Sequence, residues 1–449
     1  MHCFIRNLAE DALAIRAKDM PSSVRTKAGV CLLDFLGACM DGVDLPWARQ
    51  AMASGIVLGA GGASRVIAHT ACIGIMEAAF VNATLAGATS QMDTFAESAT
   101  HPGVSVLPAV LAAAELENSR GDDVLCAIVA GYHVMSRLGA SMYQGATTFR
   151  ARPTAIVGPI AAAAALSRLV KLDTRRTIHA MALAANTAAG LMEWANQGTM
   201  DLTFHAGTAA RNALSSWQLA RVGAIAADTA LDGAHGLMAT FDTGRKPVPC
   251  DSKYDILGVI HKPVPACVFV QSPSQVAMAI VERHKLRIQD IGAIRIHVHA
   301  TARAYPGCDH GRLPRDNQAA RMSIQYAVAA VLYRRALSAR IWAAPFDSEI
   351  GEWIEKCELL AFEDDDRAGV RACSIEVVLC DGSVIVQTAD DFHTATDDRV
   401  RKRFHESAKR VLKTDVAAGV ENQVMNLISL KNLHTLLQSM QTLNGDDID

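Results

Sequence analysis

The feature that most constrains the fold of this chain is a change of pattern at residues 262–265, which read Lys-Pro-Val-Pro. Before this point, apolar stretches of helical length follow one another, and no strand alternation is visible before about residue 255. These stretches are rich in alanine, and small side chains let helices approach closely. We therefore predict a large all-helical domain over residues 1–261, with helices over 22–42, 74–88, 104–116, 121–138, 155–169, 175–190 and 206–222.

After this point the sequence takes on strand patterns. Residues 291–300 alternate between apolar and polar, and residues 373–379 and 384–388 flank Asp381-Gly382, which is a strong signal for a β-hairpin. Residues 316–337 between them are helical in pattern. We predict a smaller α+β domain over residues 262–394. The helical remainder, residues 395–449, is expected to pack back onto the first domain, so the fold class is mainly α.

The composition narrows the class of protein. Half of the residues are hydrophobic and 20% are charged, so a sizeable core can be buried. The net charge is −3 and no run of Lys or Arg stands out, which argues against nucleic acid as a partner. The N-terminus lacks the apolar stretch of a signal peptide, and no segment offers 18 consecutive apolar residues without charges or turn signals. We therefore expect a cytoplasmic protein that does not enter a membrane.

The cysteines and histidines do not form a metal-binding pattern. The 11 cysteines are scattered and none belongs to a CxxC pair, so we expect reduced thiols that are mostly buried. The nearest metal candidates are His297-Val298-His299, whose two histidines are interpreted as alternate residues of a strand that face the same side, and Cys308-Asp309-His310. We expect no bound metal.

Six segments in a fixed order carry a family resemblance. They are VNATLAGATSQMDTFAESATHPGVSVLPAVLAAAE (81–115), GYHVMSRLG (131–139), RPTAIVGPIAAAAAL (152–166), FHAGTAARNALSSWQLARVG (204–223), KPVPAC (262–267) and ARMSIQYAVAAVL (320–332). In these segments the chain resembles the MmgE/PrpD family. The resemblance implies a large helical domain with a smaller α+β lid, a homodimer, and no organic cofactor or iron–sulfur cluster. It also implies a small di- or tricarboxylate substrate and proton transfer next to a carboxylate, in a dehydratase, decarboxylase or epimerase reaction.

Carried over residue by residue, the resemblance predicts three catalytic residues. His101, which precedes Pro102-Gly103, is expected to move the proton because an imidazole titrates near neutral pH. Lys262 is expected to bind a carboxylate or act as an acid, and Asp93 either to orient a basic group or to cap a helix. A hydrogen-bonded structural histidine and a solvated surface lysine remain the alternatives for the first two. The residues expected to bind substrate are Ser90, Thr94, Tyr143, Arg152, His205, Cys267 and Tyr305.

The chain departs from the family pattern at five positions. A usual histidine falls on Gly87, two acidic positions fall on Ser90 and Met92, a further histidine falls on Arg152, and a lysine falls on Leu202. Arginine cannot act as a general acid or base near neutral pH because its pKa exceeds about 12. It can hold a carboxylate with two parallel hydrogen bonds.

Three functions remain open at this point. The leading hypothesis is a cofactor-independent lyase or isomerase acting on a small carboxylate. The second is a catalytically altered member of the family, with a specialised biosynthetic reaction or a non-catalytic binding or scaffold role. The changes at positions 152 and 202 favour this hypothesis, and the retention of His101 and Lys262 disfavours it. The third is nucleophilic catalysis by Cys267, which needs a nearby base that no local Cys-His motif supplies.

Overall fold

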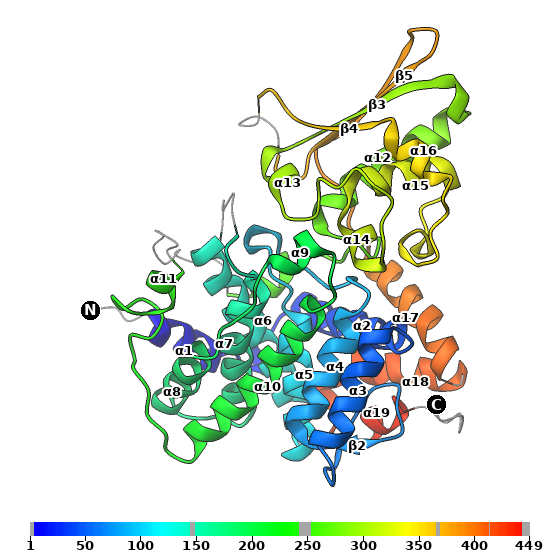
Figure 1. The fold of residues 1–449 in the computed structure, drawn as a ribbon. Helices are drawn as coiled ribbons and strands as arrows, with labels where there is room; N and C mark the ends of the chain where they lie inside the picture. Colours follow the sequence, from blue (N-terminus) through cyan, green and yellow to red (C-terminus); the bar gives the residue numbers. More distant parts are fainter. Residues whose placement is uncertain (1–3, 144–148, 242–252, 365–368, 413, 442–449) are drawn as a thin grey trace.

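The computed structural model describes residues 4–143, 149–241, 253–364, 369–412 and 414–441, and helices make up most of it (Figure 1). The predicted mainly α class is confirmed. The longer helices of the first 260 residues are α1 (Phe4–Ala14), α2 (Ser22–Gly42), α3 (Pro46–Leu58), α4 (Ile75–Gly87), α5 (Gly103–Leu116), α6 (Gly121–Tyr143), α7 (Pro153–Leu169), α8 (Thr174–Ala185) and α10 (Leu202–Arg221). The short α9 (Glu193–Gln197) and α11 (Leu237–Thr240) complete this part.

The seven helices predicted from the sequence are all present, with shifted ends. Helix α8 stops at Ala185 rather than at residue 190, and α10 begins four residues before the predicted start. The expectation of no strand before residue 255 was wrong in one place, because β1 (Ser64–Arg65) and β2 (Cys72–Ile73) form a short antiparallel pair. Strands of two residues are too short to leave an alternating pattern in the sequence.

Small residues allow the helices of this part to touch. A Cβ atom on Gly131 of α6 would lie 2.5 Å from Val106 Cγ1 on α5 and 2.9 Å from Ala165 Cβ on α7, so only glycine fits between the two neighbours. Within the described residues, α6 is the one helix long and apolar enough to cross a membrane. Of its most apolar window, 94% is buried inside the protein, as in the central helix of a helical core.

A second lobe contains a four-stranded sheet with the order β4-β3-β5-β6 (Figure 1). The predicted hairpin is confirmed as β5 (Cys373–Leu379) and β6 (Val384–Ala389), with Gly382 at a φ of +84° in the turn. Strand β3 (Ile291–Val298) is also confirmed. Two elements of this lobe were not predicted. They are β4 (Cys357–Ala361), which runs parallel to β3, and α12 (Val268–Arg283), which packs against β5 and β6.

Two details of this lobe correct the predictions. The helix expected over residues 316–337 is two helices, α14 (Asn317–Met322) and α15 (Ile324–Arg334), because Ser323 is extended and its hydroxyl caps α15 by accepting from Tyr326 N. His299 lies beyond the end of β3 and caps α13 (Ala300–Ala304), so it is not a strand residue beside His297. The lobe also contains α16 (Ile350–Glu355).

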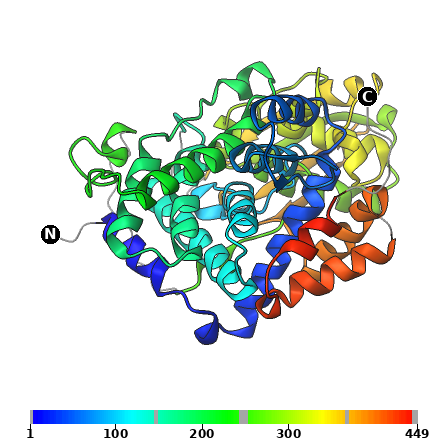
Figure 2. The same ribbon diagram turned by 90° about the horizontal axis from the view of Figure 1, so that it is seen from below.

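The C-terminal helices lie beside the N-terminal part of the chain. Helices α17 (Asp397–Val411) and α18 (Thr414–Met425) pack against α2, and α19 (His434–Ser439) packs against α18 (Figure 2). Two large hydrophobic cores result. The first joins the N-terminal helices to Phe404 and the residues after it, and the second surrounds the sheet. Met192, Trp194 and Leu202 pack into the second core although they precede residue 262. The two cores are therefore not divided at a single position of the sequence. The domain boundaries at residues 262 and 394 stay a prediction.

We predict that the protein is a homodimer. Large apolar side chains stand exposed where α3 ends and α4 begins, with Val57 at 74%, Leu58 at 66% and Met76 at 42% exposure, and burying such surface against a second copy is favourable. Static light scattering should give about twice the chain mass of 47.8 kDa. A mass of one chain at working concentration would contradict this.

Candidate active site

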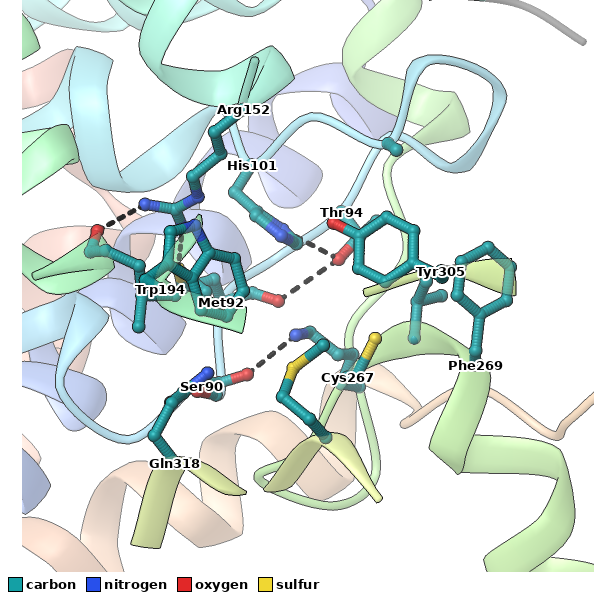
Figure 3. Close-up of a pocket in the computed structure, with 15 residues that line it drawn as sticks. Ser90, Met92, Thr94, His101, Arg152, Trp194, Cys267, Phe269, Tyr305 and Gln318 are labelled. Carbon is teal, nitrogen blue, oxygen red and sulfur yellow. Dashed lines mark hydrogen bonds between the residues drawn. The ribbon is translucent and has the colours of Figure 1, made fainter. Parts of the chain in front are cut away.

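A small pocket between the two cores brings together most of the residues that the sequence singled out (Figure 3). Ser90, Thr94, His101, Arg152, Lys262, Cys267 and Tyr305 all line it. Its volume is about 50 Å³, which holds a few water molecules. A small di- or tricarboxylate, the substrate class that the family resemblance implies, is larger than this space.

Lys262 contributes a buried ammonium group to this pocket. The residue is 1% exposed, and its Nζ donates to the main-chain oxygens of Ser90 (2.6 Å) and Ala266 (3.1 Å). Ser90 has a φ of +58°, in the left-handed region that a side chain rarely adopts, and its carbonyl oxygen is the one that meets Lys262. Burial lowers the pKa of Lys262 to about 8, with Arg152 adding to the effect.

The main-chain oxygen of Lys262 is also hydrogen-bonded. Its carbonyl oxygen accepts from Gln91 Nε2 (2.6 Å) and from Arg403 Nη1 (3.0 Å). Arg403 also forms an ion pair with Asp34, whose second oxygen is 2.8 Å from His261 Nδ1. Burial opposes the ionisation of Asp34, but its interactions with Arg403 and His261 outweigh burial and lower its pKa to about 2. A buried, charged network therefore positions Lys262.

Arg152 is a second buried cation in the pocket. It is 5% exposed and precedes α7, and its guanidinium donates to the carbonyl oxygen of Leu202 and contacts Met92 Sδ at 3.8 Å. Within the described residues it has no carboxylate partner, and burial lowers its pKa to about 10. Met92, Leu202 and Arg152 all depart from the family pattern, and the first two contact the guanidinium of the third.

His101 is oriented by the loop before α5. Its Nδ1 lies 2.9 Å from the main-chain oxygen of Asp93 and 3.1 Å from Thr94 Oγ1. A carbonyl oxygen can only accept, so the contact with Asp93 places the hydrogen on Nδ1 and leaves Nε2 with its lone pair. Burial lowers the pKa of His101 well below its ordinary value, and the charges of Lys262 and Arg152 lower it further. The side chain is therefore a neutral imidazole near neutral pH.

The side chain of Asp93 lies behind His101 and does not line the pocket. Its carboxylate accepts from Tyr132 OH (2.6 Å) and from the main-chain N–H of Gly103 at the start of α5 (3.0 Å). A Cβ atom on Gly103 would come within 2.9 Å of both Asp93 Oδ1 and the Tyr132 hydroxyl, so glycine is required in the His-Pro-Gly segment. Asp93 caps the helix with its carboxylate and holds His101 through its main-chain oxygen, so both alternatives expected from the sequence are present and Asp93 is a positioning residue.

Aromatic and sulfur side chains close one side of the pocket. Tyr305 packs against Phe269, with ring centroids 5.2 Å apart, and against Phe149 at 5.5 Å. A hydrogen bond with Cys308 lowers the pKa of the Cys267 thiol against the effect of burial. No hydrogen bond between Cys267 and His101 occurs in the part of the chain that the structure describes. His101 is therefore not placed as the base that nucleophilic catalysis by Cys267 needs.

Two other residues expected to bind substrate lie outside the pocket. Tyr143 stacks on Phe149 with centroids 6.0 Å apart, so it reaches the pocket only through the aromatic side chains. His205 is packed close to Gly190, whose carbonyl oxygen accepts from Arg152 N. Burial and the charge of Arg152 lower the pKa of His205 to about 4. We place neither residue in contact with substrate.

Sequence reasoning missed two polar residues of the pocket. Among the residues that the structure describes, the buried indole Nε1 of Trp194 and the buried amide Oε1 of Gln318 find no hydrogen-bond partner, and both residues line the pocket. Such orphaned polar atoms are rare in folded proteins, so each is available to a ligand. Trp194 lies on the short helix α9 and Gln318 follows the Asp316 cap of α14. Neither position belongs to a motif that could have drawn attention to it.

Within the described residues, no three His, Cys, Asp or Glu side chains are grouped as metal ligands. The two histidines of the candidate His297-Val298-His299 have separate roles, because His297 Nε2 lies 3.6 Å from a carboxylate oxygen of Glu376 on β5 and His299 caps α13. The absence of a bound metal stays a prediction.

Sequence comparison with known proteins identifies the family of this chain. Residues 6–249 match the MmgE/PrpD N-terminal domain, and residues 264–427 match the MmgE/PrpD C-terminal domain. The chain belongs to the MmgE/PrpD family. It is 24% identical to a cis-aconitate decarboxylase of Aspergillus terreus over 96% of this chain and 93% of that protein. A human cis-aconitate decarboxylase is 27% identical over 80% of this chain and 78% of its own length.

We predict that Lys262 makes the stability of this MmgE/PrpD protein depend on pH. The folded pKa of about 8 lies below the ordinary value of 10.5, so between these pH values the unfolded chain binds a proton that the folded chain has lost. Stability therefore rises with pH across this window, by up to about 3 kcal/mol for one such group. Thermal unfolding of wild type and Lys262→Met from pH 7 to 10 should show a melting-temperature gap that grows in favour of wild type.

Lys285→Met, which removes an exposed ammonium from the same lobe, is the matched control for the loss of one positive charge. A gap between wild type and Lys262→Met that stays constant over this pH range would show that Lys262 is not desolvated as described.

Proposed function

We propose that this chain is a lyase that moves a proton next to a carboxylate of a small di- or tricarboxylate and needs no organic cofactor. One observation carries the proposal. Arg152 and Lys262 are buried cations in one pocket, and no carboxylate lines that pocket within the described residues. A buried charge without a counterion is costly, so the pocket is built for a ligand that supplies the negative charge.

The donors of the pocket match a substrate with more than one carboxylate. The planar guanidinium of Arg152 can hold a carboxylate through two parallel hydrogen bonds, while Lys262 offers a compact charge. The unpartnered Trp194 Nε1 can donate to a further oxygen, and the amide of Gln318 can donate or accept. Cations beside the reacting carbon also stabilise the enolate-like charge that forms when a proton leaves.

His101 and Lys262 can serve as a base and an acid. His101 is neutral with a free Nε2, and a dianionic substrate that offsets the nearby cations raises its affinity for a proton. Lys262, with a pKa of about 8, is mostly protonated at pH 7. In a dehydration, His101 takes the proton from carbon, and the hydroxyl group leaves as water with a proton from Lys262. In a decarboxylation, the C–C bond breaks, CO₂ leaves, and the electron pair on carbon takes a proton from the acid.

The names of the relatives favour decarboxylation as the first reaction to assay. The Aspergillus terreus, human and mouse relatives are all cis-aconitate decarboxylases. The identities of 24–27% do not carry over a substrate, and Ser90, Arg152 and Leu202 alter the polar groups of the pocket. A specialised small-carboxylate substrate fits these changes. No feature of the pocket favours a scaffold role, because an intact buried cation pair is an unfavourable arrangement without a ligand.

We predict that His101 and Arg152 have separable kinetic roles. Once a turned-over carboxylate is found in a panel that begins with cis-aconitate, His101→Ala should lower kcat by roughly 10²–10⁴-fold, the usual effect of losing a general acid or base. Arg152→Lys should mainly raise KM, because two parallel hydrogen bonds are lost while the charge is kept. Steady-state kinetics of both variants give the answer.

Arg150→Lys is the matched control for Arg152→Lys, since Arg150 is exposed and does not line the pocket. Circular dichroism establishes that each variant is folded. A folded His101→Ala enzyme with unchanged kcat would remove His101 from the mechanism, and equal effects of the two Arg→Lys changes on KM would remove Arg152 from substrate binding.

A further inference from the structure

A second and larger cavity lies on the other side of Lys262. Its volume is about 610 Å³, within the usual range for small-molecule sites. Helix α17, helix α14, the short 3₁₀ helix Ala339–Trp342 and helix α2 all contribute to its walls. It is therefore formed where the C-terminal helices, the second lobe and the N-terminal helices meet. Five arginines line it, namely Arg321, Arg340, Arg399, Arg403 and Arg410.

The charge of this cavity is unbalanced. Its only lining carboxylates within the described residues are Asp41 and Glu406, so three positive charges remain in excess. Arg410 is paired with Asp41, and Arg403 is paired with the buried Asp34. The remaining arginines, Arg321, Arg340 and Arg399, form no ion pair within the described ranges.

Arg321 provides a second observation that points to a ligand. It is only 5% exposed, and its guanidinium makes one hydrogen bond, to the carbonyl oxygen of Ala88, while its Nε has no partner. Burial lowers its pKa to about 10. A buried guanidinium with an orphaned donor is costly unless an acceptor joins it.

We infer that this cavity is a second binding site, for a small anion that carries at least two oxyanion groups. Guanidinium groups bind carboxylates and phosphates through paired, charge-assisted hydrogen bonds. Arg340 and Arg399 come from different elements, the Ala339–Trp342 turn and α17, so one anion with two such groups can bridge them. The exposed Arg340 and Arg399 lie toward solvent, and the buried Arg321 provides the inner donor.

This second site is distinct from the catalytic pocket but shares a wall with it. Gln91 and Arg403 line the large cavity, and both donate to the main-chain oxygen of Lys262, which lines the small pocket. The cavity contains neither His101 nor Arg152. The inference therefore does not rest on the proposed reaction, and binding tests it without any assay of activity.

The test is isothermal titration calorimetry at low ionic strength with two probes, pyrophosphate and tricarballylate, which distinguish phosphate from carboxylate chemistry. The variants are Arg340→Gln/Arg399→Gln and the matched control Arg175→Gln/Arg176→Gln, which removes two exposed arginines from α8. Wild type and the α8 control should bind at least one of the two probes. Arg340→Gln/Arg399→Gln should bind the same probe with an affinity that is lower by roughly tenfold or more. Binding at the catalytic pocket should survive in all three proteins.

Three outcomes would overturn the inference. The first is identical isotherms for wild type and Arg340→Gln/Arg399→Gln. The second is an equal loss in the α8 control, which would mean that the probes respond to overall charge. The third is an altered mass in light scattering for Arg340→Gln/Arg399→Gln without altered anion binding, which would assign the cavity to contacts between copies of the chain.

Discussion

The burial of the Lys262 side chain is the constraint on which the site depends. An ammonium that is 1% exposed must be hydrogen-bonded, and it is held by the main-chain oxygens of Ser90 and Ala266. These contacts explain why Ser90 takes a left-handed backbone conformation, since its carbonyl must point at Lys262. Burial, and not these contacts, lowers the pKa of Lys262 to about 8, and the charge of Arg152 adds to the effect. Arg152 is also buried, and no described residue that lines the pocket supplies a carboxylate to balance the two cations.

Lys262 also connects segments that are far apart in the sequence. Its carbonyl oxygen is fixed by Arg403 from α17, and Arg403 is fixed in turn by Asp34 from α2. The C-terminal helices therefore do not only cover the N-terminal ones, because Arg403 of α17 donates to the main-chain oxygen of Lys262 and holds this pocket residue in place. The large cationic cavity lies at this junction, which is why an anion bound there would contact Arg403, a residue that also holds Lys262.

Local patterns predicted much of the fold and part of the site. The Asp381-Gly382 hairpin, the apolar helices and the positions of His101 and Arg152 before α5 and α7 follow from short stretches of sequence. The interactions that give these residues their properties are not local. Asp34, His261 and Arg403 meet across more than 360 residues, and the parallel pairing of β4 with β3 spans the lobe. Trp194 and Gln318 belong to no motif, and only packing reveals that their polar atoms lack partners.

The most direct measurement is a crystal structure of the protein with tricarballylate bound. If the two buried cations define the substrate site, one carboxylate will lie on the Arg152 guanidinium and another within hydrogen-bonding distance of Lys262 Nζ, with the His101 imidazole facing the carbon chain between them. A ligand that is fully occupied in this pocket but leaves both Arg152 and Lys262 without a carboxylate would contradict the account, and so would a structure in which tricarballylate fills only the large cavity.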